Sequence, residues 1–210
     1  GSGKSTLIQL IPRFYDVTGG RVLINGVDVR QMNSHELREH IGFVAQKANL
    51  FSVTIEENIR FGREDATDEE VRHAAEIAQA MDFIMDKPNG FQEKIVEGAG
   101  NLSGGQKQRL SITRALVRKP DIYIYDDSFS ALDMKTDAVL RQALKSEVKN
   151  AVVIIVAQRV STIMDADQIL VLDEGRLAAM GRHKELLKEC PLYYEIAASQ
   201  LSEEELQNVR

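Results

Sequence analysis

The sequence predicts an α/β fold, with a mostly parallel sheet covered by helices, an antiparallel β segment and an inserted helical subdomain. Short apolar runs ("IYIY", "AVVIIVA", "QILVLDEG") alternate with helical patterns, which is typical of parallel strands buried on both faces. The pair Asn25-Gly26 between apolar residues favours a hairpin. The region from about 47 to 118 is rich in helical patterns and interrupts the alternation, so we expect it to be the inserted subdomain.

Composition and charge fit one globular domain. The 210 residues are 43% hydrophobic and 28% charged, and the net charge of −6 argues against non-specific binding to nucleic acid or to an anionic membrane surface. The single cysteine, Cys190, cannot form an internal disulfide, which favours a reducing compartment. The longest apolar run, 151 to 157, is far shorter than the roughly 20 residues that span a bilayer. Any membrane role must therefore come through another segment or partner.

The first half of the chain contains these elements in order. A helix is expected over 4 to 14, a strand pair over 20 to 29, and a short strand over 40 to 46 that ends at Gln46. Helices follow over 54 to 62 and, with Asp68 as N-cap, over 68 to 85.

The second half begins with a glycine-rich loop, 97 to 106, that enters a helix ending before Pro120. Three strands are then expected, over 122 to 126, 151 to 157 and 168 to 175. The tail from 201 is predicted to be a polar helix or a frayed end.

The string "GSGKST" at 1 to 6 matches the second half of a phosphate-binding loop, G-x-x-x-x-G-K-[ST]. Because the first glycine of the motif would precede Gly1, we expect the chain to be a fragment that lacks the strand leading into the loop. Backbone N–H groups around Gly3 can face an anion at a helix start. Lys4 is predicted to contact the β- and γ-phosphates, and the Ser5 hydroxyl to ligate magnesium.

The strand "IYIYD" ends at Asp126, which places a carboxylate at the edge of the sheet where open α/β folds bind ligands. Asp126 is therefore the expected direct or outer-shell partner of a magnesium ion held by Ser5. Together with the loop, this strand predicts a P-loop NTPase core.

The string "LSGGQKQR" at 102 to 109 is the most specific in the chain, and with it the sequence closely resembles the nucleotide-binding cassette of ABC transporters. The family's motifs occur in order: a truncated Walker A loop (1 to 6), Gln46, the signature (102 to 106), a Walker B strand ending at Asp126, and a "SALD" D-loop (130 to 133). The resemblance covers residues 1 to about 190. It implies one cassette over 1 to 210, with a C-terminal helix or tail from about 190, and N-terminal strands and a membrane domain that lie upstream.

The signature adds a second anion-binding helix start, at Ser103, Gly104 and Gly105, to the one in residues 1 to 5. Two such starts and one triphosphate indicate two chains arranged head to tail. The family implies the same arrangement, with ATP and Mg²⁺ held between two cassettes. The residues expected to bind the nucleotide are Gly1, Ser2, Gly3, Lys4, Ser5, Thr6, Gln46, Ser103, Gly104, Gly105, Gln106, Asp126 and Asp133. Those expected to reach magnesium are Ser5, Gln46 and Asp126.

Two catalytic positions depart from the family pattern. Most members have a glutamate after the Walker B aspartate and a histidine after a later strand, whereas this chain has Asp127 and Gln158. Aspartate withdraws the carboxylate by roughly 1.5 Å, and misplacement on that scale can lower a rate on the order of 100-fold. Glutamine cannot carry a proton. With Gln46 as the third catalytic candidate, we expect a hydrolysis-impaired site in this chain, whose signature completes the competent site of a heterodimer partner. Neutral drift within a working homodimer is the alternative.

Three function classes are consistent with these motifs. The resemblance favours the ATPase of an exporter at the cytoplasmic face of a membrane, with the segment after Gln46 and the helical subdomain meeting the coupling helices of a membrane domain. An ABC-type ATPase acting on DNA or ribosomes is disfavoured by the negative charge and the compact insert. A regulatory module that binds ATP and never hydrolyses it is the third class, supported by Asp127 and Gln158.

Overall fold

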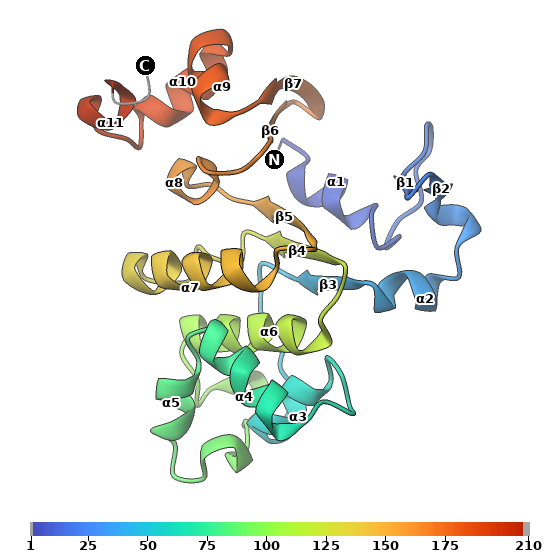
Figure 1. The fold of residues 1–210 in the computed structure, drawn as a ribbon, viewed down its shortest axis with the longest axis vertical. Helices are drawn as coiled ribbons and strands as arrows, with labels where there is room; N and C mark the ends of the chain where they lie inside the picture. The colour runs from blue at the N-terminus through green and yellow to red at the C-terminus, as the bar shows by residue number, and fades with distance from the viewer. Residues whose placement is uncertain (1, 208–210) are drawn as a thin grey trace.

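The computed structural model describes residues 2–207 and has the α/β architecture expected from the sequence (Figure 1). The strands are β1 (Leu23–Ile24), β2 (Val27–Asp28), β3 (Ile41–Val44), β4 (Ile122–Asp126), β5 (Val152–Val156), β6 (Ile169–Asp173) and β7 (Arg176–Gly181). The helices are α1 (Lys4–Gln9), α2 (Ser34–Glu39), α3 (Ile55–Arg60), α4 (Asp68–Ile77), α5 (Met81–Met85), α6 (Gly104–Arg118), α7 (Met134–Glu147), α8 (Val160–Ile163), α9 (His183–Glu189), α10 (Pro191–Ala198) and α11 (Glu203–Gln207), with short 3-10 turns at Val29–Gln31, Gly90–Gln92 and Glu97–Ala99.

The central sheet is parallel, in the order β3-β4-β5, with Phe43 opposite Ile124 and Ile124 opposite Ile154. Side chains of β4 alternate between its two faces. Ile124 belongs to one apolar cluster with Ile8 of α1, whereas Tyr125 belongs to another with Leu110 of α6. Helices α1 and α6 therefore cover opposite sides of the same strand (Figure 1).

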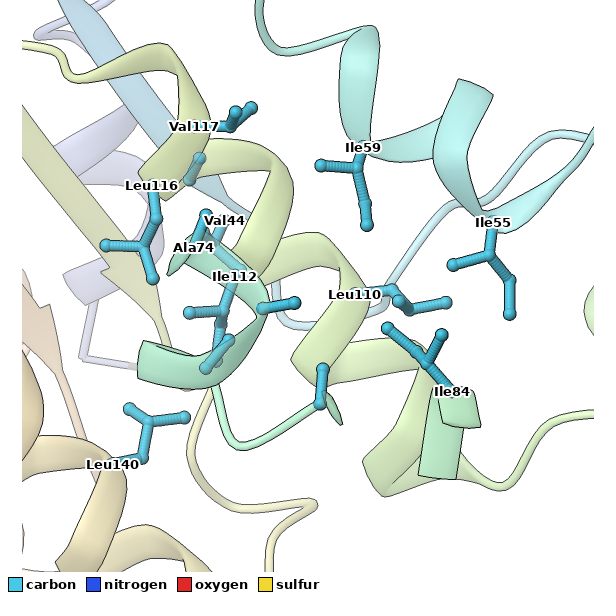
Figure 2. Close-up of a cluster of buried hydrophobic side chains, with 14 of the residues drawn as sticks. Val44, Ile55, Ile59, Ala74, Ile84, Leu110, Ile112, Leu116, Val117 and Leu140 are labelled. Atoms are coloured by element: carbon cyan, nitrogen blue, oxygen red, sulfur yellow. The ribbon is translucent and has the colours of Figure 1, made fainter. Parts of the chain in front are cut away.

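Helices α3 and α4 bury their apolar faces against α6, and α5 packs beside α4 in the same apolar cluster, which Figure 2 shows. Ile55 and Ile59 of α3 and Ile112 of α6 are fully buried. Each of the helices α3 and α4 begins with a threonine, Thr54 or Thr67, whose side chain accepts the N3 backbone N–H while the N3 glutamate returns the bond. These capping boxes position the helices where the chain enters the cluster.

The expectation of one helix over 68 to 85 with Asp68 as N-cap is wrong. Thr67 caps α4, and the chain leaves the helix after Ile77 before α5 begins. Gln79 takes a left-handed conformation, and its carbonyl oxygen accepts a hydrogen bond from Arg109 Nη1 of α6. Because the break is stabilised by a distant residue, and no glycine or proline marks it, the local pattern gave no sign of it.

The third predicted strand, 168 to 175, does not join the parallel sheet. β6 turns at Glu174 and Gly175 and pairs antiparallel with β7, which the apolar pattern did not predict. The hairpin over 20 to 29 is confirmed as β1 and β2. Other boundaries differ by a few residues: α1 ends at Gln9, β3 ends at Val44, and α6 begins already at Gly104.

Helices α9 and α10 form a C-terminal pair that packs on β6 and β7. His183 at the start of α9 and Tyr193 of α10 share a hydrogen bond of 2.7 Å between Nδ1 and the hydroxyl, and burial lowers the pKa of the histidine. The polar tail forms α11 within the described residues. None of the helices in residues 2–207 has the length and apolar character needed to cross a bilayer.

We predict that Gly62→Ala destabilises the fold, because Gly62 lies where the chain leaving α3 meets α6. A Cβ atom there would stand 2.1 Å from the carbonyl oxygen of Arg114 and 2.9 Å from Val117 Cγ1. The free energy of unfolding, measured by chemical denaturation, is expected to fall by about 1 to 3 kcal/mol or more. The matched control is Gly19→Ala, which meets nothing within 4 Å and should change stability by less than about 1 kcal/mol. Equal effects of the two substitutions would contradict the packing described for α3 and α6.

Candidate nucleotide-binding site

The phosphate-loop residues lie at the start of α1. Gly3 precedes the helix with a φ of 89°, a left-handed conformation that favours glycine. Lys4 Nζ donates a hydrogen bond of 3.0 Å to Ser2 Oγ, so the ammonium group folds back over the loop. Thr6 follows in the first turn and is exposed. Gly1, also expected to bind the nucleotide, lies outside the described residues.

Ser5 and Asp126 are in contact, as expected for two residues that would share a magnesium ion. Ser5 Oγ donates to Asp126 Oδ1 at 2.8 Å, and Asp126 is only 6% exposed. The hydroxyl and carboxylate oxygens are hard ligands of the kind that Mg²⁺ prefers. The donor set therefore fits magnesium, although these residues are 121 positions apart in the sequence.

Asp127 meets the other two catalytic candidates. Its Oδ2 accepts hydrogen bonds from Gln158 Nε2 at 2.7 Å and from Gln46 Nε2 at 3.1 Å. The residue is 7% exposed, and its φ of 49° lies in the left-handed region. A non-glycine residue in this region stores about 1 to 3 kcal/mol of strain, which the surrounding bonds must offset. The carboxylate is thus held by two amides, neither of which can exchange a proton with it near neutral pH.

The signature residues form a separate group at the start of α6. Ser103 is exposed and caps the helix: its Oγ accepts the Gln106 N–H at 3.2 Å, and its own N–H donates to Gln106 Oε1 at 3.0 Å. Gly104 and Gly105 form the first turn. Asp133 caps α7 through Thr136, whose hydroxyl lowers the pKa of the carboxyl group. No hydrogen bond among residues 2–207 joins this group to Lys4, Asp126 or Asp127.

Two further residues support the site, although no sequence motif predicts this role for them. Ser128 is fully buried, and its Oγ donates to the Val44 carbonyl oxygen at 2.8 Å, which ties the exit of β4 to the end of β3. Gln200 lies beyond α10 and bonds the backbone on both sides of Arg159, in the loop that carries Gln158. Both act through backbone groups brought together by the fold, so no local motif could indicate them.

Comparison with known proteins agrees with this geometry. The family model described as ABC transporter matches residues 1–130. An uncharacterized ABC transporter ATP-binding protein of Mycobacterium tuberculosis is 45% identical over 203 residues, covering 95% of this chain and 34% of the relative. The ATP-dependent lipid A-core flippase of Chromobacterium violaceum is also 45% identical, covering 97% of this chain and 35% of that protein.

A solved structure gives the same result in three dimensions. A bacterial Atm1-family ABC exporter with ATP bound superposes with a TM-score of 0.93 at 42% identity, covering 96% of this chain and 36% of that one. The chain thus spans about a third of the length of these relatives. The family match over more than half of the chain, together with the contacts described above, shows that the chain belongs to the ABC transporter family, as an ATP-binding domain of the exporter type.

Proposed function

We propose that this chain binds MgATP and couples its binding and hydrolysis to export of a substrate by a membrane domain. The observation that carries the proposal is the hydrogen bond from Ser5 to Asp126, next to Lys4 in the phosphate loop. The similarity to a lipid A-core flippase and to an Atm1-family exporter supports export as the coupled process. Because the chain covers about a third of those relatives, we place it in a longer protein or complex. We further place it at the cytoplasmic face of a membrane.

The residues of the chain would divide the work as follows. Backbone N–H groups after Gly3 and the Lys4 ammonium bind the β- and γ-phosphates, while Ser5 and Asp126 hold magnesium. Magnesium, when bound, neutralises the charge of the phosphates. Gln46 lies 3.1 Å from the Asp127 carboxylate, where it can orient groups near the γ-phosphate.

A second cassette completes the site in this proposal. Ser103 and Gly104, where α6 begins, are exposed, and α6 packs on the opposite face of β4 from α1, which begins at Lys4. A helix start of this kind can bind an anion. Because this one is exposed, it can contact the triphosphate bound by a partner chain. We infer a head-to-tail pair of cassettes, in which the signature of this chain serves the partner's nucleotide.

The segment after Gln46 is the proposed contact with the membrane domain. Phe51 and Phe61 are 52% and 57% exposed, and their ring centroids lie 4.7 Å apart. Asn58, which is buried, holds this segment by bonding both the N–H and the carbonyl oxygen of Phe51. Contiguous exposed apolar surface can mark an interaction site, and these two rings are the apolar surface on which the proposal rests. We assign residues 47 to 118 to a helical subdomain that transmits the state of the nucleotide to the coupling helices.

We further propose that the chain's own site is impaired in hydrolysis and that its partner in a heterodimer supplies the competent one. Two amides hold the short Asp127 carboxylate, and no histidine stands at position 158. The same contacts favour a second candidate function, a regulatory cassette whose dimer never hydrolyses ATP. Turnover by the dimer with its partner separates the two.

Replacing Lys4 tests nucleotide binding. Lys4→Ala should weaken MgATP binding at this site by about 10- to 100-fold, because a charged hydrogen bond to the phosphates is lost. Isothermal titration with the purified full-length protein measures the affinity. Lys188→Ala, at an exposed position of α9, is the control and should bind as the unmodified protein does. An unchanged affinity in Lys4→Ala would refute the assignment of the phosphate loop.

Restoring the longer acid and the imidazole tests the impairment. The double variant Asp127→Glu/Gln158→His should raise ATP turnover at this site by at least about 10-fold, since misplacement on the scale of one bond can cost on the order of 100-fold. Phosphate release is measured with the partner's own site silenced. Asp127→Asn should leave the low basal rate nearly unchanged. Brisk turnover by the unmodified chain that Asp127→Asn abolishes would mean that this site is competent.

A further inference from the structure

Gln200 binds the loop that carries Gln158 with both ends of its side-chain amide. Its Oε1 accepts a hydrogen bond from the Val160 N–H at 2.8 Å, and its Nε2 donates to the Gln158 carbonyl oxygen at 2.9 Å. The two bonds bracket Arg159, so one planar group fixes the backbone on both sides of that residue. Gln200 lies 42 positions beyond Gln158 in the chain, just after α10.

The loop depends on such external bonds, because residues 157 to 159 belong to neither a strand nor a helix. Val160, the first residue of α8, is 2% exposed and packs in a cluster with Cys190, Tyr193 and Ala197 of the C-terminal helices. On the other side, Arg141 Nη1 donates to the Ser161 carbonyl oxygen at 3.1 Å. The C-terminal helix pair therefore supports the backbone at 158 to 160 through both packing and the Gln200 amide.

The same loop reaches the nucleotide site through the Gln158 side chain. Gln158 Nε2 donates to Asp127 Oδ2 at 2.7 Å, and that oxygen also accepts from Gln46. A continuous set of hydrogen bonds thus runs from Gln200 through Gln158 to Asp127 and Gln46. Loss of the Gln200 bonds would free the backbone of Gln158 and with it the amide that holds Asp127.

We propose that Gln200 is a positioning residue: it fixes the loop at 158 to 160 so that the Gln158 amide stays on Asp127, and it makes the C-terminal helix pair a control point for the γ-phosphate side of the site. The inference rests on the proposed binding of MgATP at this site. It extends the site to a segment that carries none of the family's motifs in this chain.

The test compares Gln200→Ala with Ser199→Ala in the full-length protein, assembled with its partner cassette, whose own phosphate-loop lysine is replaced to silence that site. Ser199 is the matched control, because its one hydroxyl hydrogen bond within residues 2–207 goes to the Ile196 carbonyl oxygen of the same helix end. Affinities are measured for a non-hydrolysable ATP analogue and for ADP, each with Mg²⁺. Gln200→Ala should weaken the ATP analogue about 3- to 10-fold, as expected for one or two lost hydrogen bonds, and change ADP by less than about 2-fold. Ser199→Ala should change neither.

A double-mutant cycle separates positioning from a general structural effect. In a Gln158→Ala background, Gln200→Ala should cause no additional loss, because its effect passes through the Gln158 amide. Gln200→Glu, which keeps the acceptor for Val160 and loses the donor to Gln158, should give an intermediate affinity and covers the case of a poorly folded alanine variant.

Three results would count against this account. If the unmodified site does not bind the ATP analogue, the proposed function fails and the inference fails with it. If the unmodified site binds the ATP analogue, and Gln200→Ala binds the analogue and ADP with the same affinities as the unmodified site, the inference alone is overturned. If Gln200→Ala weakens the binding of both nucleotides equally, or if the losses of affinity in the double-mutant cycle are additive, Gln200 is a general structural residue and not a positioning residue.

Discussion

The strand β4 is the constraint on which the rest of the structure depends. Ile124 and Tyr125 are both fully buried, and they point to opposite faces, one toward the α1 side and the other toward α6. Both helices begin with residues suited to bind an anion, at Lys4 and at Ser103. Because β4 separates the two helices, the two anion-binding starts stand on different sides of the sheet. This separation is the physical basis for proposing that one triphosphate is shared by two chains.

At the carboxyl end of β4, the adjacent residues Asp126 and Asp127 have different hydrogen-bond partners. Asp126 accepts a hydrogen bond from the Ser5 hydroxyl, whereas Asp127, whose backbone is left-handed, accepts hydrogen bonds from the amides of Gln46 and Gln158. Three segments of the chain, the phosphate loop, the exit of β3 and the exit of β5, therefore meet at these two residues. Because these segments share hydrogen bonds there, a displacement of one changes the hydrogen bonds of the others. For this reason, a bond from Gln200 to the loop at 158 can affect nucleotide binding.

Features that rest on local chemistry could be predicted from the sequence. The Asn25-Gly26 hairpin is confirmed, and Asp126, which the sequence predicts as the magnesium partner of Ser5, accepts a hydrogen bond from the Ser5 hydroxyl. The roles of these residues toward ATP and magnesium stay predictions. The break after Ile77 was missed because a bond from the distant Arg109 stabilises it. The antiparallel pairing of β6 follows a turn at Glu174 and Gly175, which is a local feature that the pattern of apolar runs does not include. The support of the loop by Gln200 could not be predicted from the sequence for a similar reason: Gln200 bonds backbone atoms, and a contact with backbone atoms leaves no pattern of residue types.

Disulfide crosslinking across the proposed interface tests the central claim most directly. This chain with Ser2→Cys would be mixed with a cassette that carries a cysteine at its own signature serine, and oxidised with and without MgATP; the native Cys190 is buried. The account predicts an ATP-dependent covalent dimer, because each nucleotide joins the phosphate loop of one chain to the signature of the other. In a single chain carrying Ser2→Cys and Ser103→Cys, a disulfide formed efficiently within that chain would contradict the account, since it would bring both anion-binding helix starts to one triphosphate.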